Sequence, residues 1–196
     1  MILIFVRLAL IVLLLGSSAF VGGRSLLFIA RRYLLAFSSL VVFGACFYYA
    51  RLHFLAWGAN EIMRAFVPPY NKDGIGYFLK FLFTELFNIY LISLAAAILF
   101  IFVLNYYNKK HGERFFYKEE VYFAGTALFI IGYPGIIYYL LGLLFLYLLL
   151  HIAGLATQGM GGQISTYYMW LPLALLVILI VEYLPNYLPL YLLLKI

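Results

Sequence analysis

No Asp, Glu, Lys or Arg occurs between Val121 and Ala153. As one straight helix, this stretch would measure about 50 Å at ~1.5 Å per residue, well beyond the ~30 Å hydrocarbon core of a bilayer. The segment Gly132–Gly135, which reads Gly-Tyr-Pro-Gly, lies near its middle and is a strong helix breaker. The stretch therefore predicts two apolar helices joined by a tight turn, as in a membrane helical hairpin.

The composition of the whole chain agrees with a lipid environment. Of its 196 residues, 67% are hydrophobic and only 10% are charged, whereas a soluble domain carries about a quarter charged residues. This excludes a water-soluble globule, a disordered chain and a nucleic-acid-binding domain. We expect the lipid bilayer and other membrane subunits as partners, and no nucleic acid. The single Cys46 allows no internal disulfide, and no zinc motif occurs, so neither a metal nor a cofactor is expected.

The apolar runs predict one all-α domain over residues 1–196, a polytopic transmembrane helical bundle with about six spans. The predicted spans are residues 2–22, 33–53, 77–104, 116–131, 135–152 and 167–184. Small residues at 17–19 would also fit a signal peptide. Because a signal peptide needs a basic start and Arg7 lies within the apolar run, we interpret the first run as a retained helix.

The segment between the second and third predicted spans differs from the spans. Asn60 is a suitable cap for a short helix that Pro68 and Pro69 end. Four apolar residues would share one face of that helix: Ile62, Met63, Phe66 and Val67. This pattern is typical of an interfacial helix that lies on the membrane.

The basic residues predict the orientation of the chain. Two loops that two spans separate, and that therefore share one side, contain Arg24, Arg31, Arg32, Lys109, Lys110, Arg114 and Lys118. The other side contains Arg51, Arg64 and Lys72. Short cytoplasmic loops are enriched in Lys and Arg. We therefore predict a multi-pass protein of the plasma (inner) membrane with its N-terminus outside.

Arg7 and Glu85 are the two clear cases of a charge within a predicted span, where a charge indicates a functional site. Arg7 and Glu85 lie about 9 Å and about 12 Å from the outer ends of their spans, at ~1.5 Å per residue. Because these depths match, we predict an intramembrane pair of Arg7 and Glu85. Supporting polar residues follow on the face of Glu85: Lys80, Thr84 and Asn88. The pair either fixes helix packing or forms a proton- or ion-linked site; the sequence leaves both interpretations open.

A second group of titratable residues lies at the predicted cytoplasmic edge. Glu119 and Glu120 begin the fourth span, and His151 ends the fifth on the same side. With His111 and Glu113 of the adjoining loop they are candidates for catalytic acid/base chemistry. Alternatively, the helix dipole favours carboxylates at a helix N-terminus and a histidine at a C-terminus. The predicted topology places Glu182 at the opposite membrane face.

Three sequence features follow one another in the second half of the chain. Glu120 and Val121 open a span, Gly132–Gly135 breaks the apolar stretch, and Leu171–Ala174 places a proline in the last helix. Over roughly residues 114–184 this resembles the membrane core of the bacterial prepilin peptidases. The family's Gly-x-Gly-Asp motif is absent, since Tyr117–Glu120 occupies its place, and the one aspartate of the chain is Asp73.

Aspartyl proteolysis needs two carboxylates that share a proton, so the resemblance implies a non-catalytic relative. We therefore expect a membrane subunit or scaffold. Two alternatives stay open. One is an intramembrane protease-like enzyme that uses Glu119 and Glu120, and the other is a small transporter that uses Arg7, Glu85 and Asn88.

Overall fold

The computed structural model describes residues 2–20, 33–68, 74–112, 116, 118–156 and 167–183. These residues form helices and turns, and no strand occurs among them, which confirms the predicted all-α class. The α-helices are α1 (Ile2–Phe20), α3 (Leu34–Ala59), α4 (Ile75–Leu82), α5 (Asn88–Lys110), α6 (Lys118–Ile131), α7 (Gly135–Ala156) and α8 (Tyr167–Tyr183). A short 3-10 helix, η2 (Met63–Phe66), precedes α4, and a π-helix, η3 (Phe83–Phe87), joins α4 to α5.

Two helices in the described part are long and apolar enough to cross a membrane. They are Leu34–Ala59 and Ile75–Lys110, and the second of these combines α4, η3 and α5 in 36 continuous residues. The other predicted spans also contain helices, but their described apolar portions are shorter. The structure therefore contains a helix in every predicted span, and two of these helices have the length that a span needs.

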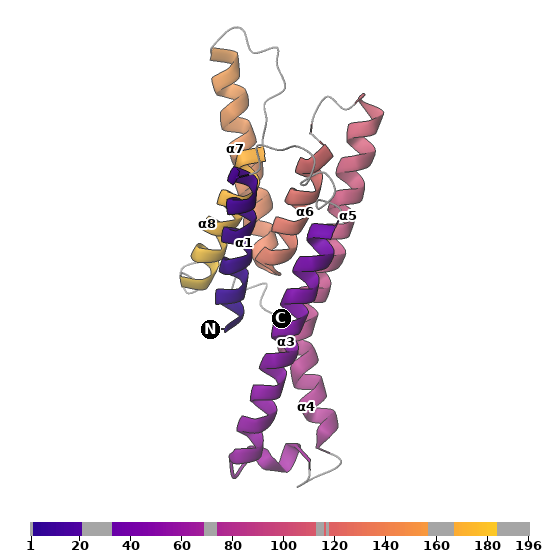
Figure 1. Cartoon of the computed structure of the whole chain (residues 1–196), viewed down its shortest axis with the longest axis vertical. Coiled ribbons are helices and arrows are strands. Elements are labelled where there is room, and N and C mark those ends of the chain that lie inside the picture. Colours follow the sequence, from indigo (N-terminus) through magenta and orange to yellow (C-terminus); the bar gives the residue numbers. More distant parts are fainter. Residues whose placement is uncertain are drawn as a thin grey trace.

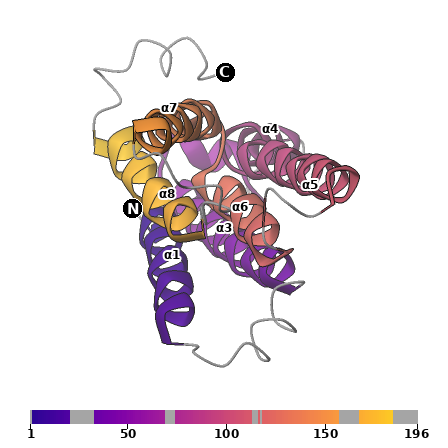
Figure 2. The same cartoon turned by 90° about the horizontal axis from the view of Figure 1, so that it is seen from above.

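Helix α6 is the centre of the molecule (Figure 2), in contact with α1, α3, α5, α7 and α8. Every side chain from Phe123 to Ile131 is buried. Small residues explain the close approach of α5. A Cβ atom on Gly125 would lie 2.3 Å from Cγ1 of Ile101 and 3.3 Å from the carbonyl oxygen of Ala97. The sequence of α6 after Glu120 has no charge, which suits this enclosed position.

The outer helices present large apolar side chains to their surroundings. On α5 these are Leu91, Ile92, Ile98, Leu99, Phe102 and Val103. On α7 they are Leu140, Leu141, Leu144, Phe145, Leu148 and Leu149. Contiguous apolar surface of this extent is rare on soluble monomers and indicates a lipid or protein environment.

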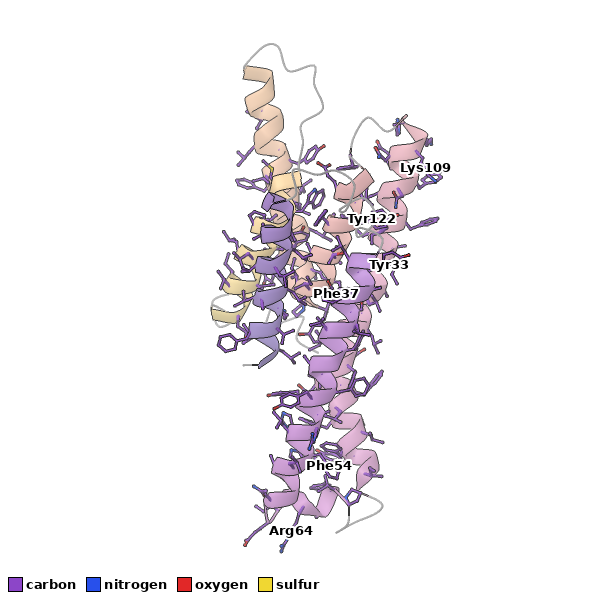
Figure 3. All side chains as sticks on the ribbon, viewed as in Figure 1. Tyr33, Phe37, Phe54, Arg64, Lys109 and Tyr122 are labelled. Atoms are coloured by element: carbon purple, nitrogen blue, oxygen red, sulfur yellow. The ribbon has the colours of Figure 1, made fainter. Side chains whose placement is uncertain are left out.

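The hairpin of α3, η2 and α4 projects beyond the other helices (Figure 1). Phe54 and Arg64 lie in this projecting part, whereas Lys109 lies at the opposite end of the molecule (Figure 3). Aromatic rings fill the hairpin: the ring of Trp57 lies 4.9 Å from that of Phe81 and 5.1 Å from that of Phe78. The projecting part is thus held by its own small aromatic core.

The predicted interfacial helix is partly wrong. Asn60 does cap the segment, because its Oδ1 accepts the backbone N–H groups of Ile62 and Met63 at 3.0 and 3.1 Å. However, a 3-10 turn replaces the expected α-helix. The four apolar residues do not share a face either: Ile62 is 77% exposed and Val67 is fully buried. A 3-10 helix has about three residues per turn rather than 3.6, and Val67 is already extended.

Two helices extend beyond the predicted span ends, because α3 continues past residue 53 to Ala59 and α5 continues past residue 104 to Lys110. The span bounds themselves stay predictions. In α5 the polar residues after Leu104 stay helical, and Asn108 among them is buried. Several residues used for the predicted orientation lie outside the described part: Arg24, Arg31, Arg32, Lys72 and Arg114. The orientation therefore stays a prediction, as does any role of Glu113, which also lies outside it.

Candidate functional site: a polar cavity at one end of the central helix

A cavity of about 260 Å³ lies at the C-terminal end of α6. It is lined by the start of α1, the middle of the long α4–α5 helix, the turn between α6 and α7, and the end of α8. Tyr49 of α3 completes the wall. The charged lining residues are Arg7, Glu85 and Glu182, each from a different element. Charged side chains from three separate parts of the sequence thus meet at one opening.

The turn at residues 132–135 forms the floor of this cavity. Gly132 adopts a φ of +77°, a conformation that residues with a Cβ atom rarely adopt. Ser93 of α5 holds the next residue, since its Oγ accepts the N–H of Tyr133 at 2.8 Å and donates to the carbonyl of Ile89 at 2.7 Å. The predicted helix breaker is therefore a tight turn that is attached to the neighbouring helix.

Arg7 binds the end of α6. Its Nε donates to the carbonyl of Ile130 at 2.8 Å, and its Nη2 donates to the carbonyl of Ile131. The last carbonyls of a helix have no partner within the helix and carry its negative dipole end. A guanidinium group at this position satisfies both the hydrogen bonds and the charge, so Arg7 acts as a C-terminal cap delivered from another helix.

Glu85 lies in the π-helical turn η3, and its side chain is exposed. Short π-helical segments within α-helices occur frequently at functional sites. Of the predicted supporting residues, Lys80 and Thr84 are exposed and Asn88 is half-buried. The hydroxyl of Thr84 donates to the backbone carbonyl of Lys80, which satisfies it locally.

The structure brings Arg7 and Glu85 to the same cavity, although it forms no ion pair between them among the described residues. Arg7 instead binds a pair of backbone carbonyls and the side chain of Tyr90, and carbonyls give no signal in a sequence. Glu182, the third charged residue of the cavity, was not predicted to belong with these two. The sequence did contain a signal for this grouping, because the predicted topology places Glu182 and Arg7 on the same membrane side.

The other candidate group lies at the opposite end of α6. Glu120 is fully buried and interacts electrostatically with Tyr147 of α7. Tyr147 lies one turn before His151 on α7, and the proximity of Glu120 and His151 stays a prediction. The side chains of Glu119 and His151 lie outside the described part. About 16 Å separates Glu120 from the C-terminal end of α6, at ~1.5 Å per residue.

Asn108 holds the chain just before α6. Its Nδ2 donates to the carbonyl of Phe116 at 2.8 Å, and its Oδ1 accepts the N–H of Phe116 at 3.1 Å. The Asn108 side chain is buried. A paired amide contact of this kind fixes the connection between α5 and α6.

A second cavity, of about 280 Å³, lies on this side of the molecule between α5, α7 and α8. Its lining is almost entirely apolar: Phe100, Leu104, Phe116, Leu140, Leu143, Leu144, Leu146, Tyr147, Met169 and Trp170. An apolar cavity of this kind suits a hydrocarbon chain and offers few groups for chemistry.

Within the described residues, no group of three or more His, Cys, Asp or Glu side chains could hold a metal ion. Comparison with protein-family models, with curated proteins and with solved structures finds no match to this chain. The functional interpretation therefore rests on the geometry of the cavity and on the helix packing.

Proposed function

We propose that the chain is a multi-pass integral membrane protein that acts as a non-catalytic subunit or scaffold of the plasma membrane. The observation that carries this proposal is that polar side chains within the helices bind backbone groups of other segments. Arg7 binds the end of α6, Ser93 binds the turn at Tyr133, and Asn108 binds the chain at Phe116. Polar backbone groups need internal partners in a bilayer, and these side chains supply them.

Six crossings are part of the proposal. The helices Leu34–Ala59 and Ile75–Lys110 have the length and composition of a span. The 14 residues of α6 measure only about 21 Å, less than the ~30 Å of a hydrocarbon core. Because its neighbours enclose α6, a short buried helix is compatible with a bundle whose outer helices meet the lipid.

The charged side chains around the cavity support the proposal that one edge of the bilayer lies at the level of the cavity. Arg7, Glu85 and Glu182 gather there, and the α4–α5 helix continues beyond Glu85 to Ile75, a further distance of about 15 Å. The projecting hairpin also carries the exposed residues Arg51 and Arg64. With the orientation predicted from the basic loops, this edge is the outer one.

The burial of Glu120 favours a non-catalytic role over the protease-like alternative. A carboxyl group that is fully buried has no surface on which a peptide substrate can bind. The absence of a Gly-x-Gly-Asp motif from the sequence agrees with this view. If the prepilin peptidase resemblance reflects ancestry, this chain has kept the helical core and lost the reaction.

Native mass spectrometry of the full chain, extracted from its own membranes in a mild detergent, tests the scaffold proposal. We expect a carbonate-resistant membrane protein with a mass above that of one chain, and Glu120→Gln should leave that mass unchanged. A single chain at every detergent concentration would contradict the scaffold role.

A small carrier is the second candidate, because a polar cavity lined by Arg7 and Glu85 lies between helices. The two roles differ in access. A carrier exposes its site alternately to both sides of the membrane, whereas a scaffold exposes it to one side only.

A cysteine scan distinguishes these roles. In a Cys46→Ser background, Glu85→Cys is treated with a membrane-impermeant thiol reagent from either side of sealed vesicles. Labelling from one side supports the scaffold, and labelling from both sides supports the carrier. Leu82→Cys is the matched control, since Leu82 lies on the same helix and is buried.

A further inference from the structure

We infer that the cavity at the C-terminal end of α6 binds a small zwitterion, with its ammonium group at Glu85 and Glu182 and its anionic group at Arg7. The inference rests on the membrane location proposed above, and it applies to a scaffold and to a carrier alike. The ligand class is a primary ammonium joined by a short carbon linker to a phosphate or a carboxylate.

The first argument is that charges of both signs line one cavity and do not pair with each other. Arg7, Glu85 and Glu182 share the cavity, and no ion pair joins them within the described residues. Opposite charges that stay apart in a confined space leave a gap that a ligand with both charges can bridge. A charge-assisted hydrogen bond is roughly twice as strong as a neutral one.

The second argument concerns the remaining donors of Arg7. Two of its nitrogens, Nε and Nη2, already bind the carbonyls of Ile130 and Ile131. These bonds fix the plane of the guanidinium group and use two of its five N–H donors, which leaves donors for the hydrogen bond with Tyr90 and for an anion. Tyr90, which is buried and lines the same cavity, lies beside Arg7. Its hydroxyl adds a second group suited to an anion.

The third argument is the balance of charge. Glu85 and Glu182 come from η3 and from the last turn of α8, so no single helix accounts for both. A simple cation would neutralise the carboxylates and leave Arg7 without an anion. A simple anion would meet Arg7 and be repelled by two carboxylates. A zwitterion satisfies both sets of groups at once.

The position of the cavity identifies two sources of such a ligand. The cavity lies at the level where the bilayer edge is proposed, and apolar residues such as Ile4 and Ile89 line it beside the charged ones. Phosphatidylethanolamine headgroups lie at that level and carry an ammonium group next to a phosphate. A soluble phosphodiester of ethanolamine, such as glycerophosphoethanolamine, carries the same charges, one ammonium group and one singly charged phosphate.

Isothermal titration of the purified full chain with glycerophosphoethanolamine tests the inference, and ethylamine and dimethyl phosphate serve as single-charge probes. A parallel arm uses nanodiscs with and without phosphatidylethanolamine and measures retained lipid by native mass spectrometry. Binding in either arm supports the inference, and the arm that responds identifies the source. We expect the single-charge probes to bind about tenfold more weakly, because each loses one set of charge-assisted hydrogen bonds.

The combined substitution Glu85→Gln with Glu182→Gln keeps the shape of the cavity and should weaken binding about tenfold or more. Glu61→Gln is the matched control, because Glu61 is exposed on the projecting hairpin outside the cavity. Absence of binding in both arms would overturn the inference, as would equal binding of ethylamine or an unchanged double variant. The scaffold role would still stand if the chain kept its membrane extraction behaviour and its native mass.

Discussion

At each end of α6 a side chain from another helix holds the backbone, and the two side chains differ in charge. At the N-terminal end, Glu120 is fully buried and the amide of Asn108 holds the preceding chain at Phe116. At the C-terminal end, the guanidinium group of Arg7 holds the last carbonyls and borders an open cavity. The neutral clamp, which is the amide of Asn108, can be enclosed at little cost once it is hydrogen-bonded. The charged clamp, which is the guanidinium group of Arg7, keeps contact with a polar space. Among the described residues, the polar cavity accordingly lies at the C-terminal end of α6, whereas the cavity near its N-terminal end is apolar.

The largest effect should come from the charged clamp. We expect Arg7→Met to lower the free energy of unfolding by about 4 kcal/mol, because two bonds from a charged donor are lost and each contributes ~1.5–3 kcal/mol. Thermal unfolding in detergent measures this change. Arg51→Met, which removes an exposed arginine of α3, should leave the midpoint unchanged. If both variants behaved alike, water rather than Arg7 would satisfy the end of α6.

The next largest effect should come from the middle of α6, which both ends share. In Gly125→Leu the new side chain meets Ile101 and the carbonyl of Ala97, and we expect a loss of about 3 kcal/mol from overpacking. Gly44→Leu is the control, because a Cβ atom there meets nothing within 4 Å. Comparable losses in the two variants would mean that α5 and α6 are not closely packed. The two ends could then no longer be compared as parts of one tightly packed helix.

Much of the helical framework was predictable, because apolar runs and their interruptions carry a direct physical meaning. The break at Gly132–Gly135 was predicted from its glycines and proline, and the structure has a turn with a left-handed Gly132 there. Helix ends were less predictable. Polar residues after Leu104 suggested a loop, but Asn108 is buried in a helix, since its amide finds a backbone partner that no sequence pattern reveals.

The candidate site was predictable only in part. Arg7 and Glu85 stood out as charges in apolar runs, and the structure places both at one cavity. The prediction of a direct pair assumed that an arginine seeks a carboxylate. A helix end offers two carbonyls and a dipole instead, and which helix ends near Arg7 depends on tertiary packing. Ser93 was missed for the same reason, because its partner is the backbone of Tyr133.

The neutral clamp should be weaker than the charged one. We expect Asn108→Ala to lower the free energy of unfolding by about 2 kcal/mol, because two neutral hydrogen bonds are lost at ~1 kcal/mol each. The matched control is Asn105→Ala, one turn earlier on α5 and half-buried. Chemical denaturation in mixed micelles measures both variants. A loss equal to that of Arg7→Met would remove the energetic difference between the two ends.

The smallest expected effect is at the turn that closes the cavity. Ser93→Ala removes the acceptor for the N–H of Tyr133, and Ser39→Ala removes a hydroxyl that binds only a carbonyl of its own helix, that of Leu35. We expect a loss of about 1 kcal/mol for Ser93→Ala, the typical value of one hydrogen bond, and almost none for Ser39→Ala. Hydrogen exchange at Tyr133 measures the change locally and should accelerate in Ser93→Ala alone. Unchanged exchange there would mean that the capping of α6 by Arg7, rather than the contact with α5, holds the turn in place.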